Sequence, residues 1–319
     1  MDENIFIGDY EIPPGKRQRL ELPLARLFTG TPLGVPVTVV NGRHSGPRVF
    51  LTSTLHGDEL NGIEIIRQVM SRLSAKNLRG AVIAVPVVNV FGFVHQTRYL
   101  PDRRDLNRSF PGSKRGSLAA RLAHLLMNEV IQQCDYGLDF HTGSHHRSNL
   151  PQIRAELENE AIRSLAEAFS APLIIDANSI NGSLRGAARN VDIPVITYEA
   201  GQPLRFSSSA ISEGINGSLR VLEHLEMIEP SEETSPPLPA AEPLIASKTR
   251  WLRASRSGIF RLATNLGDRL EKNQILGEIS NPFSSKVYKI RARHDGVIIG
   301  YTNNPLVHQG DALLHLAEV

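Results

Sequence analysis

Apolar residues along the chain switch between β-prone runs and helical spacing. The first long run, residues 49–55, stops abruptly at His56. Beyond Glu59, apolar residues recur at the three- and four-residue steps of one helix face: Ile63, Ile66, Val69 and Leu73. This pattern predicts a strand, a tight turn and a helix, with an imidazole and a carboxylate in the turn. In open α/β sheets, ligands bind at the carboxyl ends of the strands.

The same alternation continues to residue 227 and predicts an α/β layered domain. The predicted strands cover residues 81–90, 136–140, 173–176 and 195–198. The predicted helices cover residues 118–133, 156–169, 184–189 and 207–227. Residues 91–116 lack periodicity and are rich in Gly, Pro, Arg and Asp, which is typical of a long functional loop. Residues 1–48 carry short β-prone runs, at 19–24 and 35–40, and predict a β-rich approach to the main sheet.

The pattern changes after residue 228. Residues 229–249 are rich in Pro, Glu and Ser, which favours a linker or an extended strap. Residues 250–319 contain no convincing helical pattern, and short β-prone runs alternate with Gly turns. We therefore predict a main α/β domain over 1–228, a linker over 229–249 and a small all-β domain over 250–319.

Composition and charge exclude several classes of protein. The chain has 319 residues, 41% of them hydrophobic, and 35 basic against 33 acidic side chains give a net charge of +2. No basic block of five or more residues occurs, which argues against a nucleic-acid or membrane-surface role. No run approaches 18 apolar residues, and the first residues lack the apolar stretch of a secretory signal. A single cysteine, Cys134, suits a reducing compartment, so we expect a cytoplasmic protein.

Three predicted strand ends carry groups that bind metals: His56 with Glu59, His141, and Glu199. Because such ends meet at one edge of an α/β sheet, two imidazoles and two carboxylates could come together there. A catalytic zinc site uses three protein ligands, for instance two His and one Glu, and a further carboxylate can act as general base. The alternative is a capped helix start in which His56 is incidental. Asp139 could orient the His141 ring, or it could be a strand-end acid facing solvent.

The long segment before residue 117 adds arginines and amides that suit an acidic substrate. Its polar residues include Arg98, Arg103, Arg104, Asp105, Asn107 and Arg108. Guanidinium groups bind carboxylates in bidentate fashion, so an Arg with Asn beside a metal favours an acidic ligand. For Arg103 and Arg104 we prefer the alternative of a solvated basic loop.

Five ordered motifs carry a resemblance to a known family. They are His56-Gly57-Asp58-Glu59, Thr97-Arg98-Tyr99, residues 105–112 (DLNRSFPG), residues 139–143 (DFHTG) and Glu199-Ala200-Gly201. Together, over about residues 45–225, the chain resembles the succinylglutamate desuccinylase/aspartoacylase family of the zinc carboxypeptidase superfamily. The resemblance implies a zinc-carboxypeptidase-like α/β/α sandwich with a mixed sheet and a C-terminal β domain.

The resemblance also implies roles for single residues. It implies that His56, Glu59 and His141 hold one Zn²⁺ and that Glu199 is the general base and acid. It implies that Arg98 polarises the scissile carbonyl, that Asn107 and Arg108 grip a substrate carboxylate, and that Asp105 supports their loop. Arg185 resembles another carboxylate-binding arginine, with Arg189 as its rival.

The expected activity is zinc-dependent removal of an acyl group from an N-acyl amino acid or related small amide. The alternatives are a zinc carboxypeptidase acting on small peptides and a non-catalytic metal-binding module. We expect no nucleic-acid or membrane partner, and a homo-oligomer is possible. Short motifs in the C-terminal part, at residues 267–268 (GD), 274–276 (QIL), 295–297 (DGV) and 310–313 (GDAL), resemble a biotinyl/lipoyl-like barrel-sandwich. We expect this part to form one wall of the substrate mouth or to mediate oligomer contacts. Lys286 lacks the flanking Met residues of a carrier site.

Overall fold

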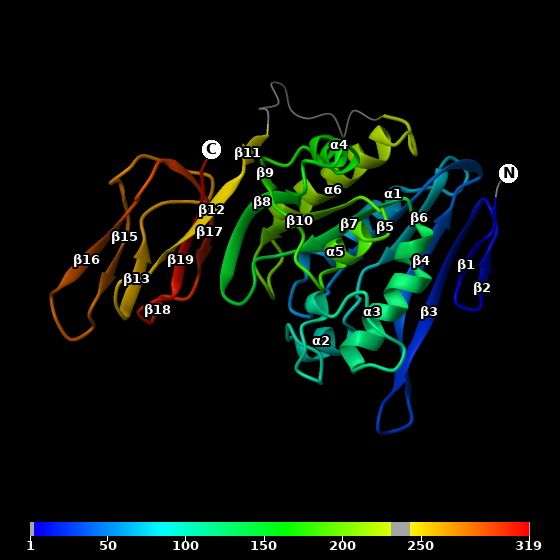
Figure 1. Ribbon diagram of the computed structural model, residues 1–319, viewed down its shortest axis with the longest axis horizontal. Helices are drawn as coiled ribbons and strands as arrows, with labels where there is room; N and C mark the ends of the chain where they lie inside the picture. Colours follow the sequence, from blue (N-terminus) through cyan, green and yellow to red (C-terminus); the bar gives the residue numbers. More distant parts are fainter. Residues whose placement is uncertain (1–2, 231–242, 319) are drawn as a thin grey trace.

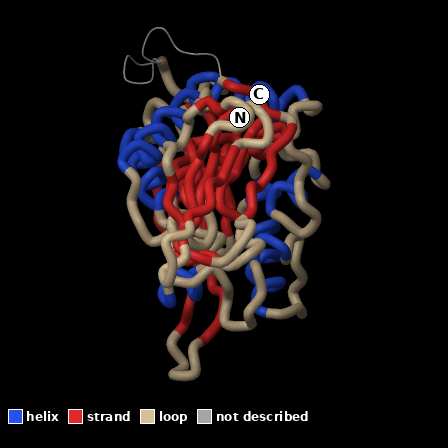
Figure 2. Tube along the Cα trace, turned by 90° about the vertical axis from the view of Figure 1, so that its left-hand side faces the viewer, coloured by secondary structure: helices blue, strands red, loops and turns tan. Residues whose placement is uncertain are grey.

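A large mixed sheet with helices on both faces forms the body of the protein (Figures 1 and 2). The structure is a computed structural model that describes residues 3–230 and 243–318. Thirteen of the described strands join this sheet: β3 (Lys16–Arg26), β4 (Pro32–Asn41), β5 (His44–Ser53), β6 (Arg79–Val85), β7 (Tyr136–His141), β8 (Arg147–Ala155), β9 (Leu173–Asp176), β10 (Val195–Gly201), β11 (Leu244–Ala246), β12 (Lys248–Arg253), β14 (Arg269–Leu270), β17 (Gly296–Thr302) and β19 (Ala312–Glu318).

The helices cover the two faces of this sheet in two groups. They are α1 (Asn61–Arg72), α2 (Val90–His95), α3 (Leu118–Glu129), α4 (Glu160–Phe169), α5 (Leu184–Arg189) and α6 (Ser208–His224). One hydrophobic core joins α1, α4 and α6 to the sheet, and a second core joins α3 and α5 to the other face. Side chains alternate between the faces along a strand, so Leu51 enters the first core and Phe50 the second.

Three neighbouring parallel strands place the predicted functional residues at one edge. β5, β7 and β10 run parallel, with Thr52 opposite Asp139 and His141 opposite Glu199. Their carboxyl ends therefore lie side by side, and the turns and strand ends that carry the polar residues meet there. This confirms the predicted α/β architecture around the three strand ends.

The C-terminal strands continue the main sheet. β17 pairs with β8, β19 with β17 and β12 with β19, all antiparallel. A second sheet lies beyond them, at the left of Figure 1, and contains β13 (Gly258–Leu262), β15 (Ile275–Ser280), β16 (Val287–Arg291) and β18 (Leu306–Val307). The described residues from 250 onward form strands and turns without a helix, as predicted. Within the predicted linker, residues 231–242 lie outside the described part, and β11 and the start of β12 occupy its end.

Several predicted boundaries were wrong. The strand predicted over 81–90 ends at Val85, because Pro86 has no N–H to continue the ladder. The segment 91–116 was predicted as loop, but it holds most of α2 and a 3₁₀ turn, Leu106–Arg108. The helix predicted from residue 156 begins at Glu160, where the Asn159 side chain accepts a hydrogen bond from a helix N–H.

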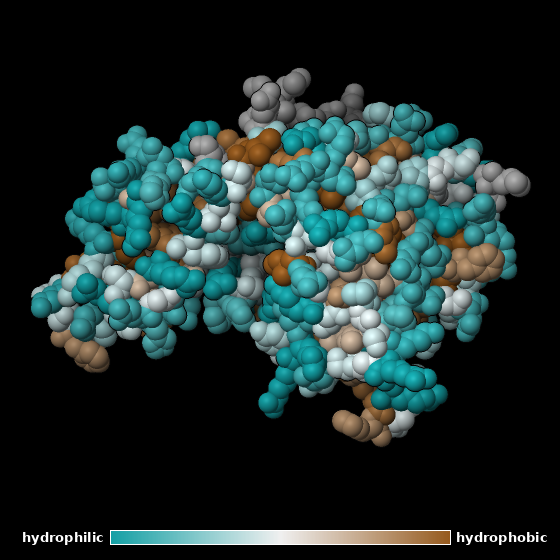
Figure 3. All heavy atoms as spheres, viewed as in Figure 1, coloured by the Kyte–Doolittle hydropathy of each residue, from teal (hydrophilic) through white to brown (hydrophobic). Residues whose placement is uncertain are grey.

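Two short strands, β1 (Ile5–Ile7) and β2 (Tyr10–Ile12), pack beside the β3–β4 hairpin, which projects from the body in Figure 1. None of the helices in the described ranges has the length and apolar character needed to cross a membrane. The visible surface is mainly hydrophilic, with hydrophobic residues in small separate groups (Figure 3).

Candidate active site

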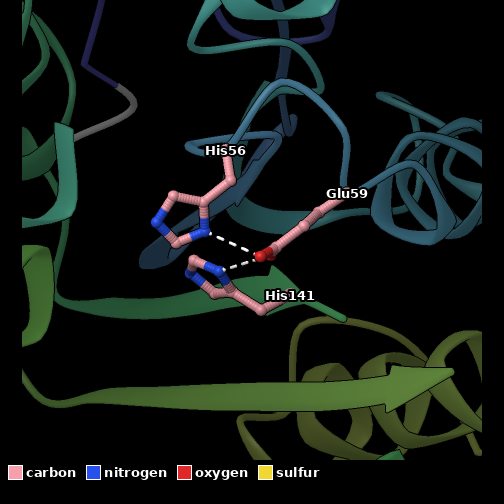
Figure 4. Close-up of side chains that lie close together, drawn as sticks. All are labelled: His56, Glu59 and His141. Atoms are coloured by element: carbon pink, nitrogen blue, oxygen red, sulfur yellow. Dashed lines mark hydrogen bonds and ion pairs between the residues drawn. The ribbon is translucent and has the colours of Figure 1, made fainter. Parts of the chain in front are cut away.

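His56, Glu59 and His141 converge on one another and form what we call the His–Glu–His cluster (Figure 4). His56 and Glu59 lie in the turn between β5 and α1, and His141 is the last residue of β7. The Nδ1 atoms of the two rings lie 2.8 Å from the two oxygens of Glu59, one ring on each oxygen. One potential ligand atom from each residue lies within 4.8 Å of the others, and all three side chains are buried.

Each histidine ring is also held on its outer side by an aspartate. Nε2 of His141 lies 2.8 Å from Asp139, whose other carboxylate oxygen accepts a hydrogen bond from the Thr52 hydroxyl. Nε2 of His56 lies 3.2 Å from Asp105. Aspartates in this position fix the ring orientation and tautomer of metal-binding histidines. The structure thus places both Asp105 and Asp139 against the cluster.

The carboxylates around the rings perturb the pKa values of the cluster. Burial disfavours the charged ring of His141, but Asp139 and Glu59 outweigh this and raise its pKa well above the usual value. Burial likewise opposes the charge on His56, yet Glu59 and Asp105 raise its pKa. Burial would raise the pKa of Glu59, and the two histidines reverse this and lower it. The cluster therefore favours positive charge beside its carboxylates.

This donor set fits a divalent cation. If Nε2 of each ring donates its proton to the outer aspartate, Nδ1 presents a lone pair to a Glu59 oxygen. Two sets of lone pairs 2.8 Å apart need a positive charge between them, which a second ring proton or a metal ion can supply. Two imidazoles and one carboxylate are also a ligand set of catalytic zinc sites.

Glu199 lies beside the cluster on the next strand. It is opposite His141 in the β7–β10 pairing, so both side chains are on the same face. Its carboxylate accepts a hydrogen bond from Asn149 at 2.9 Å and pairs with Arg154 at 3.1 Å. Residues of β8 therefore hold this carboxylate.

The predicted substrate residues also gather here. Arg98 donates to Asp105 at 2.8 Å and approaches Glu59 at 3.4 Å. Asn107 accepts a hydrogen bond from the Leu184 N–H, which ties the long loop to α5. The exposed Arg108 guanidinium donates to the Asn107 carbonyl.

Arg185 and Arg189 differ sharply in their surroundings. Arg185 is 8% exposed and donates through Nη2 to two backbone carbonyls, while its buried Nη1 has no partner. Arg189 is half exposed and pairs with Glu156. Only Arg185 of the two lines the cavity described next.

All these groups face one cavity of about 270 Å³. Residues lining it include His56, Glu59, Arg98, Asn107, Arg108, Asp139, His141, Arg185 and Glu199. Every residue predicted to take part in the chemistry lines it except Asp105, which contacts His56 and Arg98 from behind. The structure thus brings together the groups that the three strand ends and the long loop were expected to supply.

Comparison with known proteins identifies this arrangement. Residues 45–225, more than half of the chain, match the family described as Succinylglutamate desuccinylase/Aspartoacylase catalytic domain. The chain belongs to the succinylglutamate desuccinylase/aspartoacylase family. This confirms the resemblance carried by the five motifs.

Similar proteins extend the match beyond residues 45–225. The chain is 30% identical over 300 residues to N-alpha-acetyl-L-2,4-diaminobutyric acid deacetylase of Halomonas elongata, covering 89% of this chain and 86% of that one. The crystal structure of a succinylglutamatedesuccinylase/aspartoacylase from Rhodobacter sphaeroides has a TM-score of 0.83 at 29% identity, over 95% of both chains. The product-bound ectoine utilization protein EutE (DoeB) of Ruegeria pomeroyi shares the fold, with a TM-score of 0.84 at 23% identity over 97% of both chains.

Several residues that line the cavity were not identified from the sequence. Arg147, Asn149 and Arg154 come from β8, and Trp251 and His315 come from the C-terminal strands. Residues 147–149, Arg-Ser-Asn, are all polar and carry no apolar alternation that would have indicated this strand. Through Trp251 and His315 the C-terminal part forms one wall of this cavity.

Proposed function

We propose that this chain is a zinc-dependent amide hydrolase that removes the acyl group from an N-acyl amino acid. The observation that carries the proposal is the His–Glu–His cluster, whose ring nitrogens face a single buried carboxylate at the floor of a cavity that Glu199 also lines. A ligand set of this kind leaves room for a further ligand when zinc is bound.

His56, Glu59 and His141 would hold the zinc, and Asp105 and Asp139 would orient the two rings. When bound, zinc acts as a Lewis acid that makes water a stronger nucleophile near neutral pH and polarises a carbonyl oxygen.

Glu199 is the general base and acid. Its carboxylate takes the proton from the attacking water and delivers it to the nitrogen of the departing amine, which must leave protonated. The hydrogen bond from Asn149 and the ion pair with Arg154 hold the carboxylate in place at the cavity, which supports this role.

The arginines bind and polarise the substrate. Arg98 lies beside Glu59, where its guanidinium can stabilise negative charge that develops on the scissile carbonyl oxygen. Arg185 offers its unpartnered Nη1 to the substrate carboxylate, and the ion pair and exposure of Arg189 argue against the rival. Asn107 and Arg108, which the long loop places at the cavity, bind the same carboxylate of the substrate.

The relatives favour deacylation over the carboxypeptidase and binding-module alternatives. The Halomonas elongata relative is a deacetylase, and its likeness extends over most of both chains. A binding module, moreover, has no need of a carboxylate positioned to accept a proton from water. We expect the substrate to be a small N-acyl amino acid, and the enzyme to act in the cytoplasm.

The decisive experiment combines metal analysis with a substrate panel for wild type and Glu199→Gln. Wild type is expected to bind one zinc per chain and to hydrolyse N-acetyl, N-succinyl or N-formyl amino acids. Glu199→Gln should keep the zinc and lose about 10²–10⁴-fold in kcat, the usual contribution of a general base.

Glu213→Gln is the matched control, because Glu213 also pairs with an arginine, Arg220, but does not line the cavity. It should hydrolyse at the wild-type rate. Equal rates for wild type and Glu199→Gln, or cleavage of short peptides with no deacylation, would refute the proposal.

A further inference from the structure

The wall of the cavity contributed by β8 and the C-terminal strands is built from three stacked groups. Trp251 and His315 stack with ring centroids 4.5 Å apart and planes 4° from parallel. The Arg147 guanidinium lies 4.8 Å from the Trp251 ring centre, in a cation–π contact. All three line the cavity together with the His–Glu–His cluster, and we call them the distal wall.

Strand pairing explains why this wall faces the cavity. Trp251 is opposite His315, His315 opposite Gly300, and Gly300 opposite Asn149, so the four positions form one row across β12, β19, β17 and β8. Paired positions project to the same face of a sheet. A Cβ on Gly300 would lie 2.9 Å from the Asn149 side-chain oxygen and 3.3 Å from Cβ of His315. The absence of a side chain at Gly300 therefore leaves room for these two neighbours.

Arg147 is the charged member of the wall, and it lacks a carboxylate partner among the described residues. It is partly buried, and its hydrogen bond to the Ser144 hydroxyl is long at 3.5 Å. Two other cavity arginines are paired: Arg98 with Asp105 and Arg154 with Glu199. Burial, followed by the nearby Arg253 and Arg98, lowers the pKa of Arg147, and Asp311 offsets this only in part, which means that its charge is poorly compensated.

The other members of the wall do not compensate this charge. Burial, followed by the nearby Arg154 and Arg147, lowers the pKa of His315 to about 3, so its ring is neutral at physiological pH. The carboxylates that line the cavity are Glu59, Asp139 and Glu199, and each is already bonded to a histidine or an arginine. An incoming anion therefore finds a free cation at this wall, whereas an incoming ammonium group finds no free carboxylate.

Building on the proposed deacylase function, we infer that the distal wall is a subsite for a second carboxylate of the substrate, distinct from the one that Arg185 binds. Arg147 binds that carboxylate, and Trp251 positions the Arg147 guanidinium by stacking. The second carboxylate comes either from the side chain of the amino acid or from the far end of a dicarboxylic acyl group. The two sources share the same chemistry and differ only in which side of the scissile amide reaches the wall.

Two matched pairs of substrates test this with the zinc-loaded, full-length protein. N-acetyl-L-glutamate against N-acetyl-L-glutamine tests the amino-acid side, and N-succinyl-L-alanine against its succinamoyl amide tests the acyl side. Wild type should favour the anionic member of one pair by about tenfold or more in kcat/KM, as expected for a charge-assisted hydrogen bond. The pair that responds identifies the source.

Arg147→Met keeps an unbranched side chain against Trp251 and should bring that ratio close to one, with little change for the neutral substrate. Arg147→Lys keeps the charge but not the planar, stacking fork, and should retain only part of the preference. Arg250→Met is the control, because Arg250 lies on the same strand as Trp251, pairs with Glu318 and does not line the cavity. Melting temperatures establish that each variant is folded.

A wild type without preference in either pair, or a preference that survives Arg147→Met, would overturn the inference. Failure of the proposed function gives a different result, namely no turnover of any compound. In that case calorimetric binding of the same four compounds to zinc-loaded Glu199→Gln, with and without Arg147→Met, still decides whether the wall selects a carboxylate.

Discussion

The His–Glu–His cluster and the distal wall face the same cavity but are constructed in opposite ways. In the cluster every ring nitrogen has a carboxylate partner, and the three side chains are at most 5% exposed. In the wall a neutral ring and an indole carry a guanidinium that has no carboxylate partner among the described residues. The cluster together with Asp105 and Asp139 contains more carboxylates than histidines, whereas the wall holds a positive charge that no carboxylate pairs.

This difference indicates that the two parts of the cavity bind ligands of opposite charge. A buried site rich in carboxylate fixes a cation at one point, because leaving that charge unmatched is costly. A stacked cation without a carboxylate partner is free to bind an anionic ligand that enters the cavity. Substitutions in the cluster should therefore abolish activity on all substrates, and substitutions in the wall should change which substrate is preferred.

The largest effect is expected for Glu59→Gln. The amide keeps the size of the side chain but removes the charge that faces both Nδ1 atoms. Zinc content should fall from one per chain toward zero, and kcat/KM should drop by about 10³ or more on every substrate, since metal assistance contributes several kcal/mol. Metal analysis and kinetics on the same samples check this. Full activity in zinc-free Glu59→Gln protein would contradict the claim that the cluster holds a cation needed for activity.

A smaller effect is expected for Asp139→Asn. The amide can no longer act as a charged partner for Nε2 of His141, so zinc affinity should fall by about 10–100-fold while the ligands remain. A competitive chelator titration measures it. Thr52→Val, which removes only the hydrogen bond to Asp139, is the graded control and should cost less. Equal affinities for wild type and Asp139→Asn would mean that the outer aspartate is dispensable.

Gly300→Ala tests whether the row of residues that carries the distal wall also supports Glu199, the proposed general base. The new methyl group would press on the Asn149 side chain, which donates to Glu199. We expect kcat to fall by about tenfold with zinc content unchanged, because removing or displacing one charge-assisted hydrogen bond costs about 1–2 kcal/mol. Asn149→Ala should have a similar effect, and the double variant should lose less than the sum of both. If the losses of the two single variants add up in the double variant, Gly300 does not act through the Asn149 side chain.

The smallest effect concerns stability against pH. The pKa of His315 is about 3 in the folded chain, below its usual value near 6.5, chiefly because the ring is buried. The unfolded chain therefore binds more protons between these values, so this contribution to stability is complete above pH 6.5 and is lost as the pH falls toward 3. Between pH 7 and pH 5.5 wild type should lose about 1 kcal/mol more than His315→Gln in urea unfolding. Parallel losses would show that His315 is not buried in its neutral form.

The two sites also differ in how far sequence could predict them. His56, Glu59 and His141 follow apolar strands closely, so a local pattern and the geometry of parallel sheets bring them together. Strand β8 was not predicted because Pro151 breaks the β-prone pattern of its sequence and because its cavity face is polar, with Asn149 and Arg154 where an apolar residue would signal burial.

The distal wall depends on pairing between distant parts of the chain. Whether Trp251 meets Arg147 is decided by how β12, β19 and β17 add to β8, and no short-range pattern encodes that order. The choice between Arg185 and Arg189 was equally out of reach, since both lie on α5 and only packing leaves one at the cavity and the other in solvent.

The pairing of β17 with β8 has a consequence for truncated forms of the protein. The start of β8 bonds to β17, and its later residues bond to β9, whose outer edge carries β11. A fragment that stops before residue 243 would lack both β17 and β11. The unpaired peptide groups left on β8 and β9, close to Glu199, could then pair with other copies of the fragment. Truncation of the chain within residues 229–249 should therefore give aggregated protein and not a smaller, soluble catalytic domain.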